Sequence, residues 1–220
     1  MWVKICGITQ ADQAVAIAQL GADALGFICV PASRRYVEPE QIEAIAQVLQ
    51  MQPQTAAVQR VGVFVDVPID QICHIVDRTQ LTGIQLHGDE SPEACQHLRR
   101  LRPKINVIKA LRVRSPETLA AVEAYQDSVD ALLLDAFHPQ AHGGTGQTLD
   151  WSGLKTFRPP VPWLLAGGIT PENVATALAT AQPDGIDLSS GVERSPGQKD
   201  LSKVAQLFHA VADFSGHSTR

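Results

Sequence analysis

The chain has 220 residues, of which 45% are hydrophobic, and a formal net charge of −5. This composition supports a folded core, and the length suits one large α/β domain or two small ones. The acidic balance and the lack of a Lys/Arg block disfavour nucleic-acid binding. No apolar run approaches the roughly 18 residues that a membrane span needs, so we expect no membrane partner.

Short apolar runs alternate with helical patterns along the whole chain. Each apolar run predicts a buried strand, and each stretch with apolar residues three or four positions apart predicts a helix. The expected strands are 3–6, 24–29, 61–65, 82–86, 105–110, 130–134, 163–166 and 185–188. The expected helices are 10–20, 39–50, 69–77, 91–101, one that begins at Ser115, 151–157, one that begins at Thr170, and 200–213.

Several predicted helices have recognisable boundary residues. Thr9 is a candidate N-cap for the first helix, and Gly21 is a candidate stop signal behind it. Ser91 precedes Pro92 and Glu93, a pattern typical of a helix start.

Eight strand-then-helix units predict a parallel sheet, because each return to a parallel strand needs a crossover. Eight units also suit a closed (β/α)₈ barrel of near-minimal length, formed as a single domain over residues 1–220. An open, doubly wound sheet is the alternative. It is less favoured because no G-x-G-x-x-G motif follows the first strand.

The cysteines and the N-terminal stretch point to the cytoplasm. The sequence has no C-x-x-C pair, which favours free thiols in a reducing compartment over disulfides or a zinc site. The four cysteines are Cys6, Cys29, Cys73 and Cys95. The opening residues MWVKICGIT also lack the basic and long apolar regions of a secretory signal.

Polar residues follow several of the predicted strands. In a (β/α)₈ barrel the chemistry belongs at the carboxyl ends of the strands. The candidates there are Cys6, Arg35, Gln85, His87 and Asp135. Simpler readings stay open for some of them: an inert buried thiol, a surface Arg35, a structural His87, and a loop cap at Asp135.

The loop behind Asp135 is rich in glycine. Gly143, Gly144 and Gly146 let backbone N–H groups approach a ligand closely. The same loop contains His138 and His142, but no matching ligand set accompanies them, so we do not expect a metal site.

The loops after the seventh and eighth strands predict a phosphate site. Gly167 and Gly168 precede one predicted helix, and Ser189, Ser190 and Gly191 precede another possible helical turn. Exposed N–H groups and the helix dipole there favour an anion, and barrels frequently bind phosphate at this pair of loops. Tight turns alone would also explain the glycines, but the pattern occurs in both loops.

Lys4 lies two residues before Cys6 and therefore on the same face of its strand. If Cys6 faces the barrel interior, Lys4 is an interior cation that requires a carboxylate partner. Asp187 and Asp66 are the candidates. The alternative is a lysine that extends toward the other end of the barrel.

Taken together, the motifs along nearly the whole chain resemble those of the phosphoribosylanthranilate isomerase family of tryptophan biosynthesis. They are KICGIT (4–9), GFICVPASRRYV (26–37), GVFVD (62–66), QLHGDE (85–90), LLLDAF (132–137), HGGTGQTLDW (142–151), LAGGITPENV (165–174) and DLSSGVERSPGQKD (187–200).

The resemblance implies a (β/α)₈ barrel that catalyses the Amadori rearrangement of N-(5-phosphoribosyl)anthranilate to 1-(2-carboxyphenylamino)-1-deoxyribulose 5-phosphate. By resemblance, Asp135 is the general acid, Cys6 is the general base, and Arg35 faces the anthranilate carboxylate with His87 nearby. The resemblance implies no cofactor and no metal. It implies a monomer or a homodimer, since relatives of both kinds exist.

Two other classes of function remain as alternatives. One is a phosphosugar carboxy-lyase that forms an indole ring, whose chemistry calls for a lysine acid and a glutamate at strand ends. Lys109 is available, but no matching glutamate is obvious. The other is a non-enzymatic barrel that binds a phosphometabolite, which would keep the phosphate loops without needing Cys6 or Asp135.

Overall fold

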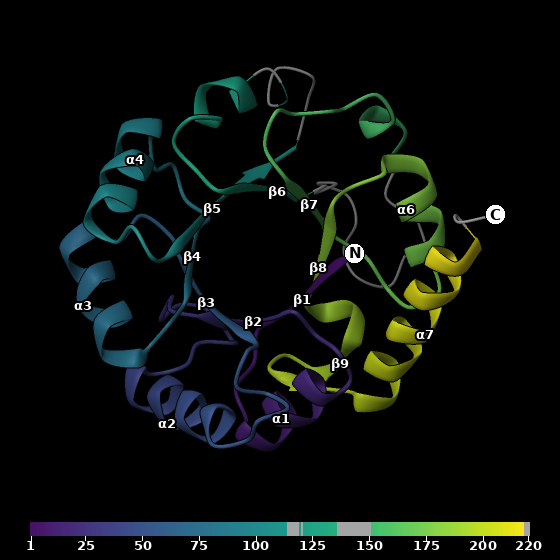
Figure 1. Ribbon diagram of the computed structural model, residues 1–220, viewed down its shortest axis with the longest axis horizontal. Helices are drawn as coiled ribbons and strands as arrows, with labels where there is room; N and C mark the ends of the chain where they lie inside the picture. Colours follow the sequence, from purple (N-terminus) through teal and green to yellow (C-terminus); the bar gives the residue numbers. More distant parts are fainter. Residues whose placement is uncertain (114–118, 120, 136–150, 218–220) are drawn as a thin grey trace.

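The computed structural model describes residues 1–113, 119, 121–135 and 151–217. Eight parallel strands close into a barrel in the order β1 to β8, with β1 paired to β8. Figure 1 looks along the barrel, with the strands as an inner ring and the helices outside it. The strands are β1 (Trp2–Cys6), β2 (Ala24–Ile28), β3 (Gln59–Phe64), β4 (Gly83–Leu86), β5 (Asn106–Arg112), β6 (Ala131–Asp135), β7 (Trp163–Ala166) and β8 (Gly185–Leu188). The prediction of a closed (β/α)₈ barrel is confirmed.

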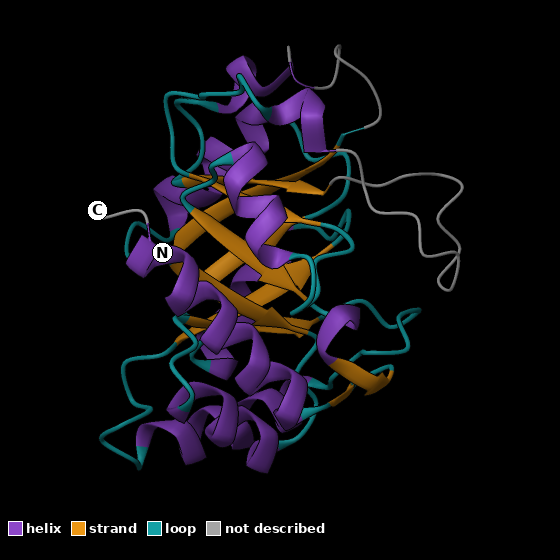
Figure 2. Ribbon diagram, turned by 90° about the vertical axis from the view of Figure 1, so that its right-hand side faces the viewer, coloured by secondary structure: helices purple, strands orange, loops and turns teal. Residues whose placement is uncertain are grey.

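The outer layer consists of helices that follow the strands in turn. Within the described residues the α-helices are α1 (Ala11–Gln19), α2 (Pro39–Gln50), α3 (Ile69–Thr79), α4 (Pro92–Leu101), α6 (Val174–Ala181) and α7 (Leu201–His217). Short 3₁₀ helices are η1 (Ala121–Tyr125), η2 (Trp151–Leu154) and η3 (Ser190–Val192). An antiparallel hairpin, β9 (Glu193–Ser195) and β10 (Gln198–Lys199), follows η3. In the side view of Figure 2 the strands are inclined, with helices packed on both flanks. No helix among the described residues is long and apolar enough to cross a membrane.

The boundary residues were predicted with mixed success. The Ser91 hydroxyl accepts a hydrogen bond from Ala94 N at 3.3 Å, which confirms it as the N-cap of α4. Gly21 has a φ of +106°, a conformation that glycine adopts without strain, just beyond the end of α1. The N-cap at Thr9 is wrong, because Gln10 holds that position and the Thr9 hydroxyl instead donates to the Gly197 carbonyl at 2.6 Å.

Two predicted helices differ from those found. The helix after β7 begins at Val174 rather than at Thr170. Its start is delayed because the Asn173 side chain accepts from Thr170 N at 2.8 Å and donates to Gly168 O at 2.9 Å, which holds this stretch in a turn. The stretch expected at 151–157 is the single 3₁₀ turn η2. Ser115, the expected start of another helix, lies outside the described residues.

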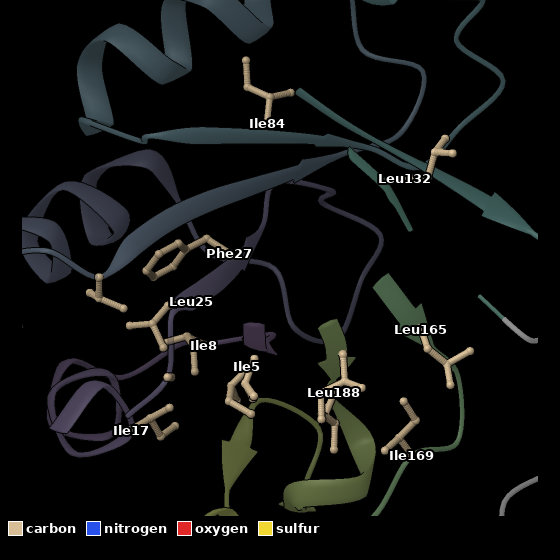
Figure 3. Close-up of a cluster of buried hydrophobic side chains, with 14 of the residues drawn as sticks. Ile5, Ile8, Ile17, Leu25, Phe27, Ile84, Leu132, Leu165, Ile169 and Leu188 are labelled. Atoms are coloured by element: carbon tan, nitrogen blue, oxygen red, sulfur yellow. The ribbon is translucent and has the colours of Figure 1, made fainter. Parts of the chain in front are cut away.

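Apolar residues form two separate cores. The larger lies between the strands and the helices, and Figure 3 shows part of it, where Ile8 and Leu25 lie beside Ile17 of α1. The smaller fills the barrel interior from alternate strand positions: Ala24, Val61, Ile108, Ala110, Leu133, Leu164 and Ala166. Because successive side chains of a strand face opposite sides, β2, β3, β5, β6 and β7 supply both cores.

The same alternation brings polar side chains into the barrel at its carboxyl end. Cys6, Gln85, Asp135 and Asp187 belong to the inward-facing set of β1, β4, β6 and β8, and all four line one cavity. The strands thus position the candidate site on rigid backbone.

Candidate active site

A cavity of about 320 Å³ opens at the carboxyl ends of the strands. It is lined by every predicted site residue that falls within the described chain: Cys6, Arg35, Gln85, His87, Asp135, Gly167, Gly168, Ser189, Ser190 and Gly191. Gly143, Gly144 and Gly146, with His138 and His142, lie outside the described residues. The fold therefore brings together residues from the strand ends and from the loops behind them.

On the β1 side of the cavity, Cys6 is accompanied by a buried ion pair. The Lys4 ammonium, which has no solvent exposure, donates to Asp187 Oδ1 at 3.0 Å. The interior-cation reading of Lys4 is confirmed, with Asp187 as its partner. Asp66, the other candidate, instead accepts a hydrogen bond from Asp89 N at 2.7 Å.

The charge environment of Cys6 is mixed. Burial raises the pKa of the Cys6 thiol above its usual value, and the Asp187 carboxylate acts in the same direction. The Lys4 and Lys199 ammonium groups oppose this shift. Burial also disfavours the charge of Lys4, but Asp187 and Cys6 outweigh it, so the pKa of Lys4 lies above its usual value. The Lys4–Asp187 ion pair therefore favours a charged ammonium beside the thiol.

Arg35 lies in the cavity wall but is not a free cation. Its Nε donates to Glu193 Oε1 at 2.9 Å, and its Nη2 donates to Glu193 Oε2 at 2.6 Å. Glu193 also accepts from the buried Lys199 ammonium at 2.8 Å. Lys199 donates in turn to the Cys6 carbonyl and to Ser189 O, the latter at 3.3 Å. The β9–β10 hairpin thus ties the loops after β1, β2 and β8 together.

The pKa shifts in this network follow from burial and pairing. Burial lowers the pKa of the Lys199 ammonium, against the pull of Glu193. Burial alone would raise the pKa of the Glu193 carboxyl, but Arg35 and Lys199 outweigh it and the pKa is lowered. The hydrogen bonds to Glu193 raise the pKa of the Arg35 guanidinium. Glu193 therefore stays ionised between its two cations.

His87 lies between Gln85 and Asp135 in the cavity wall. Gln85 Nε2 lies 3.1 Å from His87 Nδ1, and His87 Nε2 lies 3.7 Å from Asp135 Oδ2. The second distance is longer than a hydrogen bond, so His87 faces the carboxyl group without bonding to it. Gln85 is buried, and its Oε1 has no partner among the described residues.

The two glycine-rich loops pack directly against each other. Gly167 and Gly168 have φ values of +90° and +65°, which side-chain-bearing residues rarely adopt. A Cβ atom on Gly191 would lie 1.9 Å from Ile169 O, so glycine is required for the loops to meet. The N–H of Thr170 already donates to Asn173, and α6 begins later than expected, so Gly168 and the start of η3 are the candidate anion-binding positions.

Lys109 has a glutamate partner that the sequence did not reveal. Its buried ammonium lies 2.8 Å from Glu90 Oε2 and 2.6 Å from Gly88 O. Neither Lys109 nor Glu90 is among the residues that line the cavity. The pair therefore braces the loop after β4 rather than facing a ligand.

Sequence reasoning missed Glu193 and Lys199. Both belong to the DLSSGVERSPGQKD motif, but charged residues in a loop normally indicate a solvated surface. The local sequence pattern around Glu193 and Lys199 did not indicate that these two side chains are buried. The one available signal was the pair of unlike charges six residues apart within a motif behind the last strand.

The position of this cavity defines the class of protein. Catalytic groups of α/β barrels come from the carboxyl ends of several strands, and a thiol, an imidazole and a carboxylate meet there in this chain. The molecule is accordingly an enzyme of the (β/α)₈-barrel class.

Comparison with known proteins narrows the class to one family. Residues 3–210 match the family described as N-(5'phosphoribosyl)anthranilate (PRA) isomerase. The N-(5'-phosphoribosyl)anthranilate isomerase of Acaryochloris marina is 59% identical over 212 residues, which cover 96% of this chain and 98% of the relative. The chain belongs to this family, whose members catalyse an isomerisation in tryptophan biosynthesis. Family membership sets aside the indole-forming and the non-enzymatic alternatives.

Solved structures agree with this assignment. A phosphoribosyl anthranilate isomerase in complex with reduced 1-(o-carboxyphenylamino)-1-deoxyribulose 5-phosphate is 34% identical, with a TM-score of 0.82 over 97% of this chain and 99% of that chain. A structure of monomers generated from the dimeric enzyme of Thermotoga maritima is 33% identical, with a TM-score of 0.81 over 96% of this chain and 98% of that chain.

Proposed function

We propose that this isomerase works by acid–base catalysis, with Asp135 as the general acid and Cys6 as the general base. The observation that carries the proposal is that the thiol and the carboxyl group line one cavity from two different strands, β1 and β6. Two separate groups suit a rearrangement that moves one proton to a ring oxygen and takes another from a neighbouring carbon.

The proton transfers balance over the reaction. Asp135 in its acid form donates to the furanose oxygen, the bond between that oxygen and C1 breaks, and the anilino nitrogen supplies the electron pair of the resulting iminium. The Cys6 thiolate then removes the proton from C2, which yields an enolamine. Tautomerisation to the ketone adds a proton to C1 and removes one from the C2 oxygen. Proton exchange through water returns Cys6 to its thiolate and Asp135 to its acid form.

The two ends of the substrate have separate anchoring sites in this proposal. Phosphate binds to backbone N–H groups around Gly168, Ser190 and Gly191, where the glycine loops meet. The anthranilate carboxylate binds to Arg35. In support, the ligand of the solved relative contains both a phosphate and a carboxyphenyl group. Anchoring both ends orients the reacting carbons between Cys6 and Asp135.

Gln85 and His87 complete the binding site. The Gln85 oxygen, which is buried and unpartnered among the described residues, accepts a hydrogen bond from the substrate. His87 faces Asp135 and orients it toward the ring oxygen. In the same hypothesis the backbone of Gly144 and Gly146, which lie outside the described residues, also binds the substrate.

We further propose that the enzyme acts in the cytoplasm, as a monomer or a homodimer. Four cysteines that are all free and buried suit a reducing compartment. The dimeric enzyme of Thermotoga maritima supports the homodimer as one of the two states.

Steady-state kinetics of Cys6→Ser and Asp135→Asn test the assignment of roles. We expect each variant to lose about 10²- to 10⁴-fold in kcat with a modest change in KM, as is typical when a general acid or base is removed. Cys29→Ser is the matched control, because Cys29 is a buried cysteine of the neighbouring strand end that does not line the cavity. Circular dichroism must show that each variant is folded. Nearly full kcat in folded Cys6→Ser would refute the role of the thiol.

A further inference from the structure

The immediate surroundings of Cys6 contain a buried cation that the reaction, as proposed, does not use. Lys4 and Cys6 are two residues apart on β1, and both face the barrel interior. Lys4 is fully buried, whereas lysine is almost never buried without a reason. Its partner Asp187 lines the cavity, so the ion pair reaches the edge of the active site.

The neighbouring strand is shaped to let the Lys4 ammonium and the Cys6 thiol meet. Gly26 of β2 lies opposite Cys6 in the strand register. A Cβ atom on Gly26 would lie 2.6 Å from Cys6 Sγ and 3.0 Å from Lys4 Nζ. Any side chain at this position would therefore displace one group or both. The absence of a side chain at Gly26 leaves the ammonium and the sulfur bordering the same small space.

Asp187 fixes where the ammonium sits. It holds Lys4 Nζ at 3.0 Å across the β1–β8 seam, where Lys4 and Asp187 are register partners. The ammonium therefore lies between a carboxylate on one side and the thiol on the other. Since an ammonium has three donors, it can serve both groups at once.

We propose that Lys4 is a positioning residue for the isomerisation: its ammonium, held by Asp187, holds the Cys6 thiolate in the cavity wall ready to accept the substrate proton. This inference rests on the proposed role of Cys6 as the base. A thiol in an apolar interior would stay protonated near neutrality, because burial disfavours the anion. A fixed cation beside the thiol opposes that penalty without itself entering the chemistry.

Other charged and titratable groups also face Cys6, and the test has to distinguish their effects from that of Lys4. They come from β8, from β10 and from the loop after β2: Asp187, Lys199, Arg35 and Cys29. Lys199 and Arg35 both pair with the single carboxylate of Glu193. The Lys4–Asp187 pair can be altered without touching that network.

The proposal makes opposite predictions for the two members of the ion pair. Lys4→Met removes the cation at similar length, so the pH midpoint for alkylation of Cys6 by iodoacetamide should rise by at least about one unit. Asp187→Asn removes the carboxylate and leaves the cation, so the midpoint should fall. The readout is the rate of modification of the Cys6 peptide by mass spectrometry at a series of pH values, which requires no turnover.

Two further variants keep the test decisive. Lys4→Met combined with Asp187→Asn leaves no unpaired buried charge, so it gives the readout even if Lys4→Met alone fails to fold, and its midpoint should still lie above that of the unmodified enzyme. Glu90→Gln breaks the buried Lys109–Glu90 pair, which does not line the cavity, and should leave the Cys6 midpoint unchanged.

The outcomes separate the role of Lys4 from that of Cys6. Midpoints that move in opposite directions support the proposal, and the acid limb of kcat should move with them. Midpoints that stay in place, or that move together in Lys4→Met and Asp187→Asn, overturn it and leave the pair as a structural brace. Full activity of Cys6→Ser would instead refute the base, whatever the alkylation midpoints show.

Discussion

Arg35 offers the sharpest test of how the enzyme recognises its substrate. The guanidinium presents one edge, formed by Nε and Nη2, to Glu193. A guanidinium has five N–H donors, so the edge formed by Nη1 and the remaining Nη2 proton can still bind a carboxylate at two points. Glu193 therefore orients Arg35 rather than occupying it, and Arg35→Ala should remove the anchor for the anthranilate carboxylate.

The structure limits the size of the effect. Truncating one partner of a buried, hydrogen-bonded charge pair costs about 2–5 kcal/mol of binding free energy. The Arg35 side chain is 24% exposed, so solvent screens it in part and the lower end of that range applies. A loss of about 2–3 kcal/mol corresponds to about 30- to 150-fold weaker binding. Arg35→Lys should recover little, because a lysine cannot serve Glu193 and the substrate through two parallel pairs of hydrogen bonds.

Binding measurements with two ligands distinguish a loss of carboxylate recognition in Arg35→Ala from a general distortion of the cavity. The dissociation constants of the product and of a product analogue without the carboxylate are measured for the unmodified enzyme and for Arg35→Ala. We expect the variant to bind the product weakly but to bind the analogue nearly as well as the unmodified enzyme does. Urea unfolding of the same preparations reports any loss of stability from Glu193, which keeps Lys199 as a partner.

Equal losses for both ligands would contradict this reasoning. Arg35 would then act through Glu193 and the loop after β8, as a brace of the cavity wall, and the carboxylate would have to bind elsewhere.

Two further predictions concern the phosphate loops and the buried thiols. Gly191→Ala should weaken product binding, because its Cβ would lie 1.9 Å from Ile169 O. Overpacking of about 1–3 kcal/mol corresponds to a loss of about 5- to 150-fold in affinity. Gly153→Ala is the control, because a Cβ atom there would have nothing within 4 Å. Equal product binding by the two variants, or a product-bound structure with its phosphate beside Arg112, would contradict the phosphate site. Burial raises the pKa of Cys29 to about 12 and that of Cys95 to about 11, so the native state keeps these protons while the unfolded thiols ionise. The free energy of unfolding should therefore fall as pH rises past about 9, by about 1.4 kcal/mol per thiol and pH unit. Urea titrations should show a shallower decline for the double variant Cys29→Ala, Cys95→Ala. An unchanged decline would refute the raised pKa values of these two thiols.

Much of the fold was readable from local sequence. Strands buried on both faces appear as short apolar runs, and the bounds of β7 and β8 are those the sequence predicted. The glycines behind these strands mark loops that need unusual backbone conformations, which is why these loops could be placed at the cavity from the sequence. Cys6, Gln85 and Asp135 were identifiable because barrels expose the residues at the carboxyl ends of their strands.

The partners of the charged residues were decided by the tertiary structure. Lys4 and Asp187 are 183 positions apart and meet because β1 closes the barrel against β8. Arg35 and Glu193 are 158 positions apart and meet because the β9–β10 hairpin folds over the loop after β2. Periodicity reports which face of an element is buried, but it has no information on which distant side chain will occupy the same space. The cost of burying a charge is offset once the closed barrel has brought its counter-charge within about 3 Å, and that proximity is a property of the assembled chain.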